Sequence, residues 1–405
     1  MASRTSVALA DGSEIEEWRL ILILVVATAI GPFSMQIFLP ALPAIQAGFA
    51  VSAATAQLAF SLSALAMAGA TLIYGPFSDR LGRRPALITG LVVFLVGSLV
   101  CAFASSIGLL ILGRIIQAAG GCAGMVLGRA IVRDLYDRER SAAAIAYVTM
   151  AMVVAPMVAP AIGGVLTDLF GWPAVFLVGG ALGVPVLIAV RGHLPETLAP
   201  RGGPATLRSM LDDFATLIRL PAFLGFALQG GFSMAVFFSF LAAAPYVMIT
   251  VLERPPSEYG LMFVVVSAAF MAGNFTAARL NRRLGVNRMV IGGSAATLFG
   301  TCVLLLLVPA IYLTPWALFL PMMLVSFGQG MSLPNSLAAV ISIRPALAGA
   351  ASGLAGFLQM GLAAVVAQIT GSIQAGTPYP MAIGMTVSAL LMMASAVFAV
   401  RHART

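Results

Sequence analysis

The sequence predicts an all-α membrane protein with twelve transmembrane helices arranged as two six-helix pseudo-repeats. Its 405 residues are 60% hydrophobic and 9% charged, with a mean hydropathy of +1.03. The chain divides into about a dozen apolar stretches of roughly 20 residues, each long enough to cross a bilayer as a helix. Short motifs of the first half also recur in the second. A large soluble core is the alternative, and this composition argues against it.

The predicted spans follow one another with short polar connections. They lie near residues 19–43, 54–74, 86–104, 108–129, 142–166, 172–190, 221–249, 259–279, 288–309, 315–341, 347–374 and 380–400. The first eighteen residues carry four acids and no cleavable signal pattern, so we expect the first helix to be retained.

Residues 191–220 are polar and rich in proline and glycine, and they end in the amphipathic piece LRSMLDDFATLIRL. We expect a cytoplasmic linker whose last part lies along the membrane surface. The predicted units are therefore an N-terminal bundle (1–190), the linker (191–220) and a C-terminal bundle (221–405).

The basic residues orient the chain, and all 22 of them are arginine. With twelve helices threaded from a cytoplasmic N-terminus, 19 arginines fall in cytoplasmic segments and Arg254 in an external one. Arg114 and Arg129 lie within a span or at its end. The positive-inside rule therefore predicts that both termini are cytoplasmic. The net charge of +8 then describes a surface beside anionic lipid, and we expect no nucleic-acid partner.

Three motifs of the first half recur about 200 residues later in the same order. FSMQIF at 33–38 returns as FSMAVF at 232–237, MAG at 67–69 returns at 271–273, and RLGRR at 80–84 returns as RRLG at 282–285. Chance similarity between apolar helices is the alternative. The common order and spacing favour an internal duplication, which is usual in secondary transporters.

The stretch GPFSDRLGRRPAL, residues 75–87, places one acid and three arginines between two apolar runs. Such a cluster cannot lie in hydrocarbon, so we expect a polar loop at the water edge of a tight connection between two helices. Glycine permits the turn, and Asp79 can cap a helix or pair with Arg83.

The fourth span contains RIIQAAGGCAGMVLGR, in which Arg114 and Gln117 share a helix face. An arginine in the middle of a span costs at least about 2.5 to 3.5 kcal/mol on insertion scales. We therefore expect Arg114 to face a water-filled cavity, with a role in substrate binding or coupling. The alternative is a structural tie to backbone carbonyls and to Gln117.

The fifth span contains APMVAPAIGGVL, with Pro156, Pro160, Gly163 and Gly164. The prolines break backbone hydrogen bonds and predict a kink, and the glycine pair permits close contact with a neighbouring helix. An ordinary proline kink without further function is the alternative.

The stretch GPFSDRLGRRPAL resembles the signature loop of the major facilitator superfamily, and the following stretches resemble its drug:proton antiporter branch, in particular the bicyclomycin and chloramphenicol resistance group. The resemblance covers nearly the whole chain and is densest from about Phe33 to Thr197. The resemblance implies two bundles around a central cavity that opens to one side at a time, with transport driven by an ion gradient. It implies that Asp79, Arg83 and Asp134 latch the cytoplasmic side in the outward-open state, and that the fifth-helix motif marks an exporter. Ala118 and Ala159 stand where the two motifs usually have glycine.

One departure from the resembled group concerns coupling. The group commonly has an aspartate in the first helix where this chain has Gln36, and no Asp or Glu lies near the middle of any predicted span. Proton coupling normally needs a group that titrates inside the membrane. With Arg114 as the only deep charge, a neutral or anionic substrate is favoured over a large cation.

Other chemistry is disfavoured. The chain has no lysine, which a Walker A loop requires, and its two histidines and three cysteines lack the spacing of a metal site. We expect no enzyme activity, catalytic residue, cofactor or metal.

These observations predict a monomeric secondary transporter of the bacterial inner membrane, which exports small apolar drugs in exchange for protons and confers antibiotic resistance. The expected substrate contacts are Gln36, Arg114, Gln117, Met234, Phe237, Gln329 and Asn335, and the expected gating residues are Asp79, Arg83, Asp134, Pro156, Pro160, Gly163 and Gly164. Two alternatives stay open. One is an importer or exchanger of a small organic anion, and the other is a non-transporting receptor on the same fold.

Overall fold

The computed structural model describes residues 6–8, 14–136, 138–198, 207–312, 314–373 and 376–403. Strands β1 (Ser6–Ala8) and β2 (Glu14–Glu16) pair antiparallel before the first helix. The first half then contains α1 (Glu17–Ile37), η1 (Leu39–Ala41), α2 (Leu42–Gly48), α3 (Ala53–Leu81), α4 (Arg83–Ala102), α5 (Ile107–Leu135), α6 (Arg138–Phe170) and α7 (Pro173–His193). Helix α8 (Leu207–Ile218) lies in the predicted linker. The second half contains α9 (Pro221–Tyr246), η2 (Val247–Val251), α10 (Pro256–Leu284), α11 (Val286–Leu306), α12 (Val308–Ile311), α13 (Trp316–Ile343), η3 (Pro345–Leu347), α14 (Ala348–Ser372) and α15 (Tyr379–His402).

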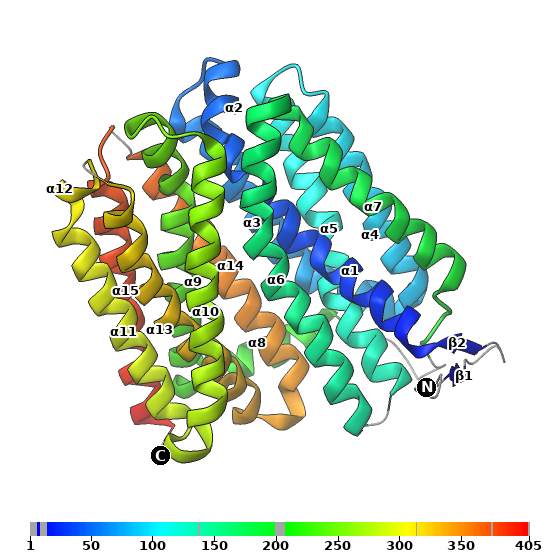
Figure 1. Ribbon diagram of the computed structural model, residues 1–405. Coiled ribbons are helices and arrows are strands. Elements are labelled where there is room, and N and C mark those ends of the chain that lie inside the picture. The colour runs from blue at the N-terminus through cyan, green and yellow to red at the C-terminus, as the bar shows by residue number, and fades with distance from the viewer. Residues whose placement is uncertain are drawn as a thin grey trace, which may run out of the picture.

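Every predicted span falls on a helix. In the described part of the chain, eleven helices are long and apolar enough to cross a membrane, and α6 adds a shorter apolar stretch, Val154–Phe170. Figure 1 shows α1 to α7 on one side of the molecule and α9 to α15 on the other. The protein is therefore an all-α, multi-pass membrane protein, and the fold class read from the sequence is confirmed.

The two halves repeat the same backbone turn. Gly82 alone separates α3 from α4, with φ 100° and ψ 154°, and Gly285 alone separates α10 from α11, with φ 79° and ψ 161°. This region of φ and ψ is essentially restricted to glycine. The predicted polar loop at 75–87 is therefore wrong in its extent, because both helices continue to the glycine and the chain reverses in one residue.

Both glycine turns lie at one face of the molecule, together with the start of α1 and the end of α15 (bottom of Figure 1). We call it the basic face because its helix ends carry Arg80, Arg83, Arg84, Arg282, Arg283, Arg288, Arg344 and Arg401. Helices α2 and α12 lie at the opposite face.

Helices within each half meet through small residues. A side chain at Gly120 of α5 would collide with the backbone of Phe94 in α4, and one at Gly124 would collide with that of Ala27 in α1. In the second half, Gly293 of α11 and Gly328 of α13 face each other's carbonyls. Small residues let backbones approach closely, and this is the usual basis of helix packing inside membranes.

Candidate functional site

Arg114 lies in the interior of the first half and its side chain is fully buried. Its Nη1 donates to the carbonyl of Ser34 at 3.1 Å and to Oε1 of Gln117 at 2.6 Å, and its Nη2 lies 3.4 Å from the sulfur of Met35. The guanidinium carbon stands 3.9 Å from the centre of the Phe38 ring. The arginine therefore links α5 to α1 by hydrogen bonds and a cation–π contact.

The expectation that Arg114 faces a water-filled cavity is wrong for this conformation. A carbonyl, an amide, a sulfur and an aromatic ring compensate the charge, while its Nε has no hydrogen-bond partner among the described residues. Gln117 extends the network, because its Nε2 donates to Ser98 of α4 at 2.9 Å. These contacts match the alternative reading, a structural tie to backbone carbonyls and to Gln117.

Gln36 lies on α1 beside this network and is buried, with 6% of its surface exposed. Its Oε1 has no hydrogen-bond partner among the described residues. A buried acceptor without a donor is unfavourable by about 1 to 3 kcal/mol, so this oxygen is available for a donor that enters the protein.

The second half has a buried polar network without a charge. Gln229 of α9 donates from Nε2 to Ser294 of α11 at 3.2 Å, and its Oε1 accepts from Ser336 of α13. Gln329 donates from Nε2 to the carbonyl of Ser233 at 2.6 Å. Sequence reasoning missed Gln229, although its position four residues before Ser233 puts both on one face of α9.

The other predicted substrate contacts are dispersed over the second half. Asn335 is buried and donates to the carbonyl of Met331, one turn earlier on its own helix, at 2.7 Å. Met234 and Phe237 are partly buried on α9, and the Phe237 ring lies 6.1 Å from that of Phe263. The hydrogen bonds of Gln329 and Asn335 stay in the second half and those of Arg114 and Gln117 in the first.

Arg83 is the centre of a charge cluster at the basic face. Its Nη1 lies 2.6 Å from Asp79, its Nε lies 2.9 Å from Oδ2 of Asp134, and its Nη1 also donates to Ser78 at 2.5 Å. The side chains of Arg83 and Asp134 are 10% and 11% exposed, whereas that of Asp79 is 40% exposed. The structure thus brings the three predicted gating residues together across the ends of α3, α4 and α5.

Glu196, which sequence reasoning did not single out, completes this cluster. Its carboxylate accepts from the backbone N–H groups of Arg83 at 2.8 Å and Arg84 at 3.3 Å, which belong to the first turn of α4. It also accepts from the N–H groups of Thr197 and Leu198. The N-cap residue of α4, Gly82, has no side chain, so Glu196 supplies the cap from 113 residues further along the chain.

Hydrogen bonds between the two halves gather near the face opposite the basic face. Ser61 of α3 donates to Oε1 of Gln368 of α14 at 2.5 Å, and Nε2 of Gln368 donates to the carbonyl of Ala54 at 3.0 Å. Asp168, at the end of α6, accepts from the N–H of Ser257, at the start of α10, at 3.1 Å. These bonds join the halves at helix ends far from Arg83.

One of the two glycines of α6, Gly164, lies in the same interface. A side chain at Gly163 would collide with the carbonyl of Ile37 in α1, and one at Gly164 with the carbonyl of Pro256 in α10. Reciprocally, Gly260 of α10 faces the carbonyl of Pro160. Helix α6 is continuous through both Pro156 and Pro160. Gly164 and Gly260 therefore make a contact of backbone against backbone between the halves, which we call the glycine seal, whereas Gly163 packs against α1 within the first half.

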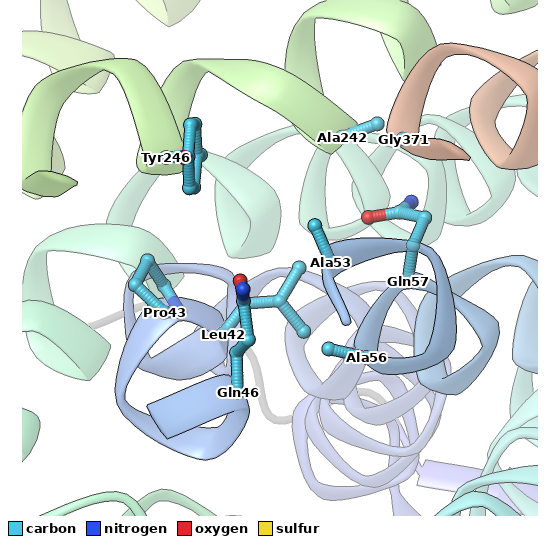
Figure 2. Close-up of a pocket in the computed structure, with 9 residues that line it drawn as sticks. All are labelled: Leu42, Pro43, Gln46, Ala53, Ala56, Gln57, Ala242, Tyr246 and Gly371. Atoms are coloured by element: carbon cyan, nitrogen blue, oxygen red, sulfur yellow. The ribbon is translucent and has the colours of Figure 1, made fainter. Parts of the chain in front are cut away.

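A small pocket lies between the halves at the face opposite the basic face (Figure 2). It has about 300 Å³ of empty space, part of which is open to solvent. Its walls are Leu42, Pro43, Gln46, Ala53, Ala56, Gln57, Ala242, Tyr246 and Gly371. Gln57 is buried and its Nε2 has no hydrogen-bond partner among the described residues.

Nothing in the described ranges resembles a metal centre. No three His, Cys, Asp or Glu residues of these ranges stand close enough to hold an ion, and the three cysteines, Cys101, Cys122 and Cys302, are free thiols.

Comparison with known proteins identifies the family. The model of the Major Facilitator Superfamily matches residues 24–368. The chain is 26% identical to a bicyclomycin resistance protein homolog of Haemophilus influenzae, over 89% of this chain and 91% of that protein. It is 29% identical to multidrug resistance protein D of Escherichia coli, over 92% and 93%. The crystal structure of a D-xylose–proton symporter shares the fold with a TM-score of 0.74 at 16% identity, covering 94% of this chain and 97% of the symporter. A family model that matches most of the chain, together with the eleven candidate spans and the shorter apolar stretch of α6 in the described residues and the repeated glycine turns, shows that this protein is a membrane transporter of the major facilitator superfamily.

Proposed function

We propose that this transporter exports small apolar drugs or other toxic compounds from a bacterial cytoplasm by alternating access, in exchange for protons. Two relatives that match about nine-tenths of the chain carry the names of drug-resistance proteins, which supports this substrate class. The single observation that carries the mechanism is the position of the described hydrogen bonds between the halves, which all lie toward one face. The halves are joined at one face by hydrogen bonds and the glycine seal, while the charge cluster lies at the other.

The distribution of arginines indicates which face of the protein lies on which side of the membrane. If the basic face is cytoplasmic, as the positive-inside rule requires, both termini are inside and the joined face is external. The present conformation is then closed to the outside of the inner membrane. The bundles 1–190 and 221–405 would move as rigid units, joined by the linker 191–220. The transporter would function as a monomer.

Opening to the outside requires the external contacts to separate. Gly164, with Pro156 and Pro160 on the same helix, would leave the backbone of α10 as the halves rotate, while Gly163 keeps its contact with α1 inside the first half. Asp79 is the exposed member of the Arg83 cluster, so it is free to reach the second half when the cytoplasmic ends meet. Asp79, Arg83 and Asp134 would then latch the outward-open state.

The substrate site is proposed between the halves, at Gln36, Met234, Phe237, Gln329 and Asn335. The oxygen of Gln36 without a partner supplies an acceptor for a substrate that carries a hydrogen-bond donor. Arg114 and Gln117 would act indirectly, because they hold the backbone of α1 beside Gln36.

The substrate should be neutral or anionic, because the spans have no acid near their middle to receive a cation. Proton exchange would then have to use groups nearer the helix ends, such as Asp79 or Asp134. Resistance to cationic dyes conferred by this protein would contradict the assignment of substrate charge.

Flux in proteoliposomes tests the function. Drug movement driven by an imposed pH gradient is the expected result for the purified wild type, and Asp79→Ala should abolish it while the protein still inserts. Arg282→Ala, at the matching place in the second repeat, should retain transport. Counterflow of an organic anion without response to pH would support the exchanger, and no solute movement would support a receptor. If the Asp79→Ala variant transports at the wild-type rate, Asp79 is not part of a cytoplasmic latch.

A further inference from the structure

We infer that the end of the second half at the basic face is a binding surface for the headgroups of anionic phospholipids. Six arginines at the helix ends around it have exposed side chains, and we call them the arginine rim. They are Arg219, Arg282, Arg283, Arg288, Arg344 and Arg401. The inference concerns the membrane around the protein and does not depend on what the protein exports.

One apolar cluster brings half of the rim together. Leu217 of α8 is fully buried in a cluster that also contains residues of α9, α11, α13, α14 and α15, and α8 itself packs against α9 and α14. Val290 of α11, Ile343 of α13 and Val400 of α15 belong to the same cluster. Arg288 stands two residues before Val290, and Arg344 and Arg401 directly follow Ile343 and Val400. Three of the six arginines are therefore attached to helix ends that meet in one apolar cluster.

The rim has few counter-charges of its own, and the two acids of α8, Asp212 and Asp213, form no ion pair with it among the described residues. Among the described residues, none of the six arginines forms an ion pair, whereas Arg83 of the first half has two acidic partners and Arg19 has Glu16. The whole stretch from 221 to 405 contains two acids, Glu253 and Glu258, and both lie near the opposite face. Counter-charge for the rim has to come largely from outside the chain.

The exposed apolar face of helix α8 indicates that the membrane supplies this counter-charge. Leu211 and Ile218 lie on one face of α8 and are 55% and 47% exposed, although both are large and apolar. Asp212 and Thr216 lie on a different face of the helix. An amphipathic helix with an exposed apolar face and arginines nearby is typical of a segment at the membrane interface. Leu211 and Ile218 would lie among acyl chains at the level of the phosphates.

Phospholipid chemistry fits the rim. A guanidinium group binds phosphate oxygens with two parallel hydrogen bonds, and it keeps its charge at any physiological pH. Basic residues near a membrane surface are attracted to anionic lipids by about 1 kcal/mol each. The first half, in which Arg83 and Arg19 are paired with acids, should bind such lipids more weakly.

Lipid binding to the purified full-length chain tests the inference. Native mass spectrometry and thermal unfolding in detergent would compare phosphatidylglycerol with phosphatidylcholine of the same acyl chains. We expect phosphatidylglycerol to bind more tightly and to raise the unfolding temperature. The triple variant Arg288→Gln, Arg344→Gln, Arg401→Gln should lower its affinity by roughly tenfold or more.

Two variants separate charge from folding. Replacement of the same three positions by lysine should retain most of the phosphatidylglycerol effect, and Arg19→Gln, which removes an arginine already paired with Glu16, should leave it unchanged. An equal response of the wild type to both lipids would overturn the inference without any variant. So would a full response in the triple glutamine variant, or a shift reproduced by inorganic phosphate alone.

Discussion

The turns at Gly82 and Gly285 have the same backbone and different chemistry. Each is a single glycine at positive φ between two helices of a repeat. Around Gly82, Arg83 joins Asp79 and Asp134, and Glu196 caps α4. At the matching places in the second repeat, Arg282 replaces Asp79 and Val286 replaces Arg83.

The difference separates what the fold needs from what function adds. The fold needs only a residue that can reverse the chain, and glycine meets this need in both repeats. The acids are needed for neither the turn nor the topology, yet they remain in the first repeat. We therefore expect substitutions around Gly82 to lower the stability of the protein more than the matching substitutions around Gly285.

The largest difference is expected for the residue that follows each glycine. Arg83→Ala leaves Asp134 almost buried without its partner, which should destabilise the protein by about 3 to 5 kcal/mol. Val286→Ala removes only part of a half-buried aliphatic side chain and should cost about 1 kcal/mol. Thermal unfolding in detergent measures both, and equal losses would mean that the ion pairs do not stabilise the first repeat.

The glycines themselves come next. Alanine at either position has to adopt a strained conformation, which costs on the order of 1 to 3 kcal/mol. At Gly82 the new Cβ would also displace the carboxylate of Glu196, whereas nothing lies within 4 Å at Gly285. Gly82→Ala should therefore lower the unfolding temperature more than Gly285→Ala, and the reverse order would contradict the role given to Glu196.

A smaller effect is expected at Glu196. Glu196→Gln keeps the shape and removes the charge that faces the first turn of α4, which should cost about 1 kcal/mol. Hydrogen exchange should become faster at the amides of Arg83 and Arg84. Glu253→Gln, at an exposed position near the opposite face, is the matched control and should leave these amides unchanged.

The smallest effect compares the residues four places before each glycine. Ser78 accepts a hydrogen bond from Arg83, so Ser78→Ala should cost about 1 kcal/mol. Asn281 has a buried Oδ1 without a partner among the described residues, so Asn281→Ala should be close to neutral. A clear loss of stability in the asparagine variant would show that its oxygen is bonded in solution.

The sequence was informative wherever the signal is local or periodic. Spans follow from apolar length, the turns from glycine in a repeated motif, and the proximity of Asp79 to Arg83 from their spacing of one helical turn. The environment of Arg114 was not predictable, because Ser34 and Phe38 reach it only after α1 packs on α5. Glu196 and Gln368 were missed for the same reason, since their partners lie 113 and 307 residues away.

The glycine seal has a consequence for how the transport cycle can be regulated. Carbonyl oxygens and Cα atoms neither titrate nor respond to ionic strength, so this contact should be equally firm in acid, in alkali and in concentrated salt. Environmental control would then act mainly through ionisable side chains elsewhere, such as those around Arg83. A bulky residue engineered at Gly164 or Gly260 would wedge the two backbones apart and offers a way to trap the opposite conformation for crystallography.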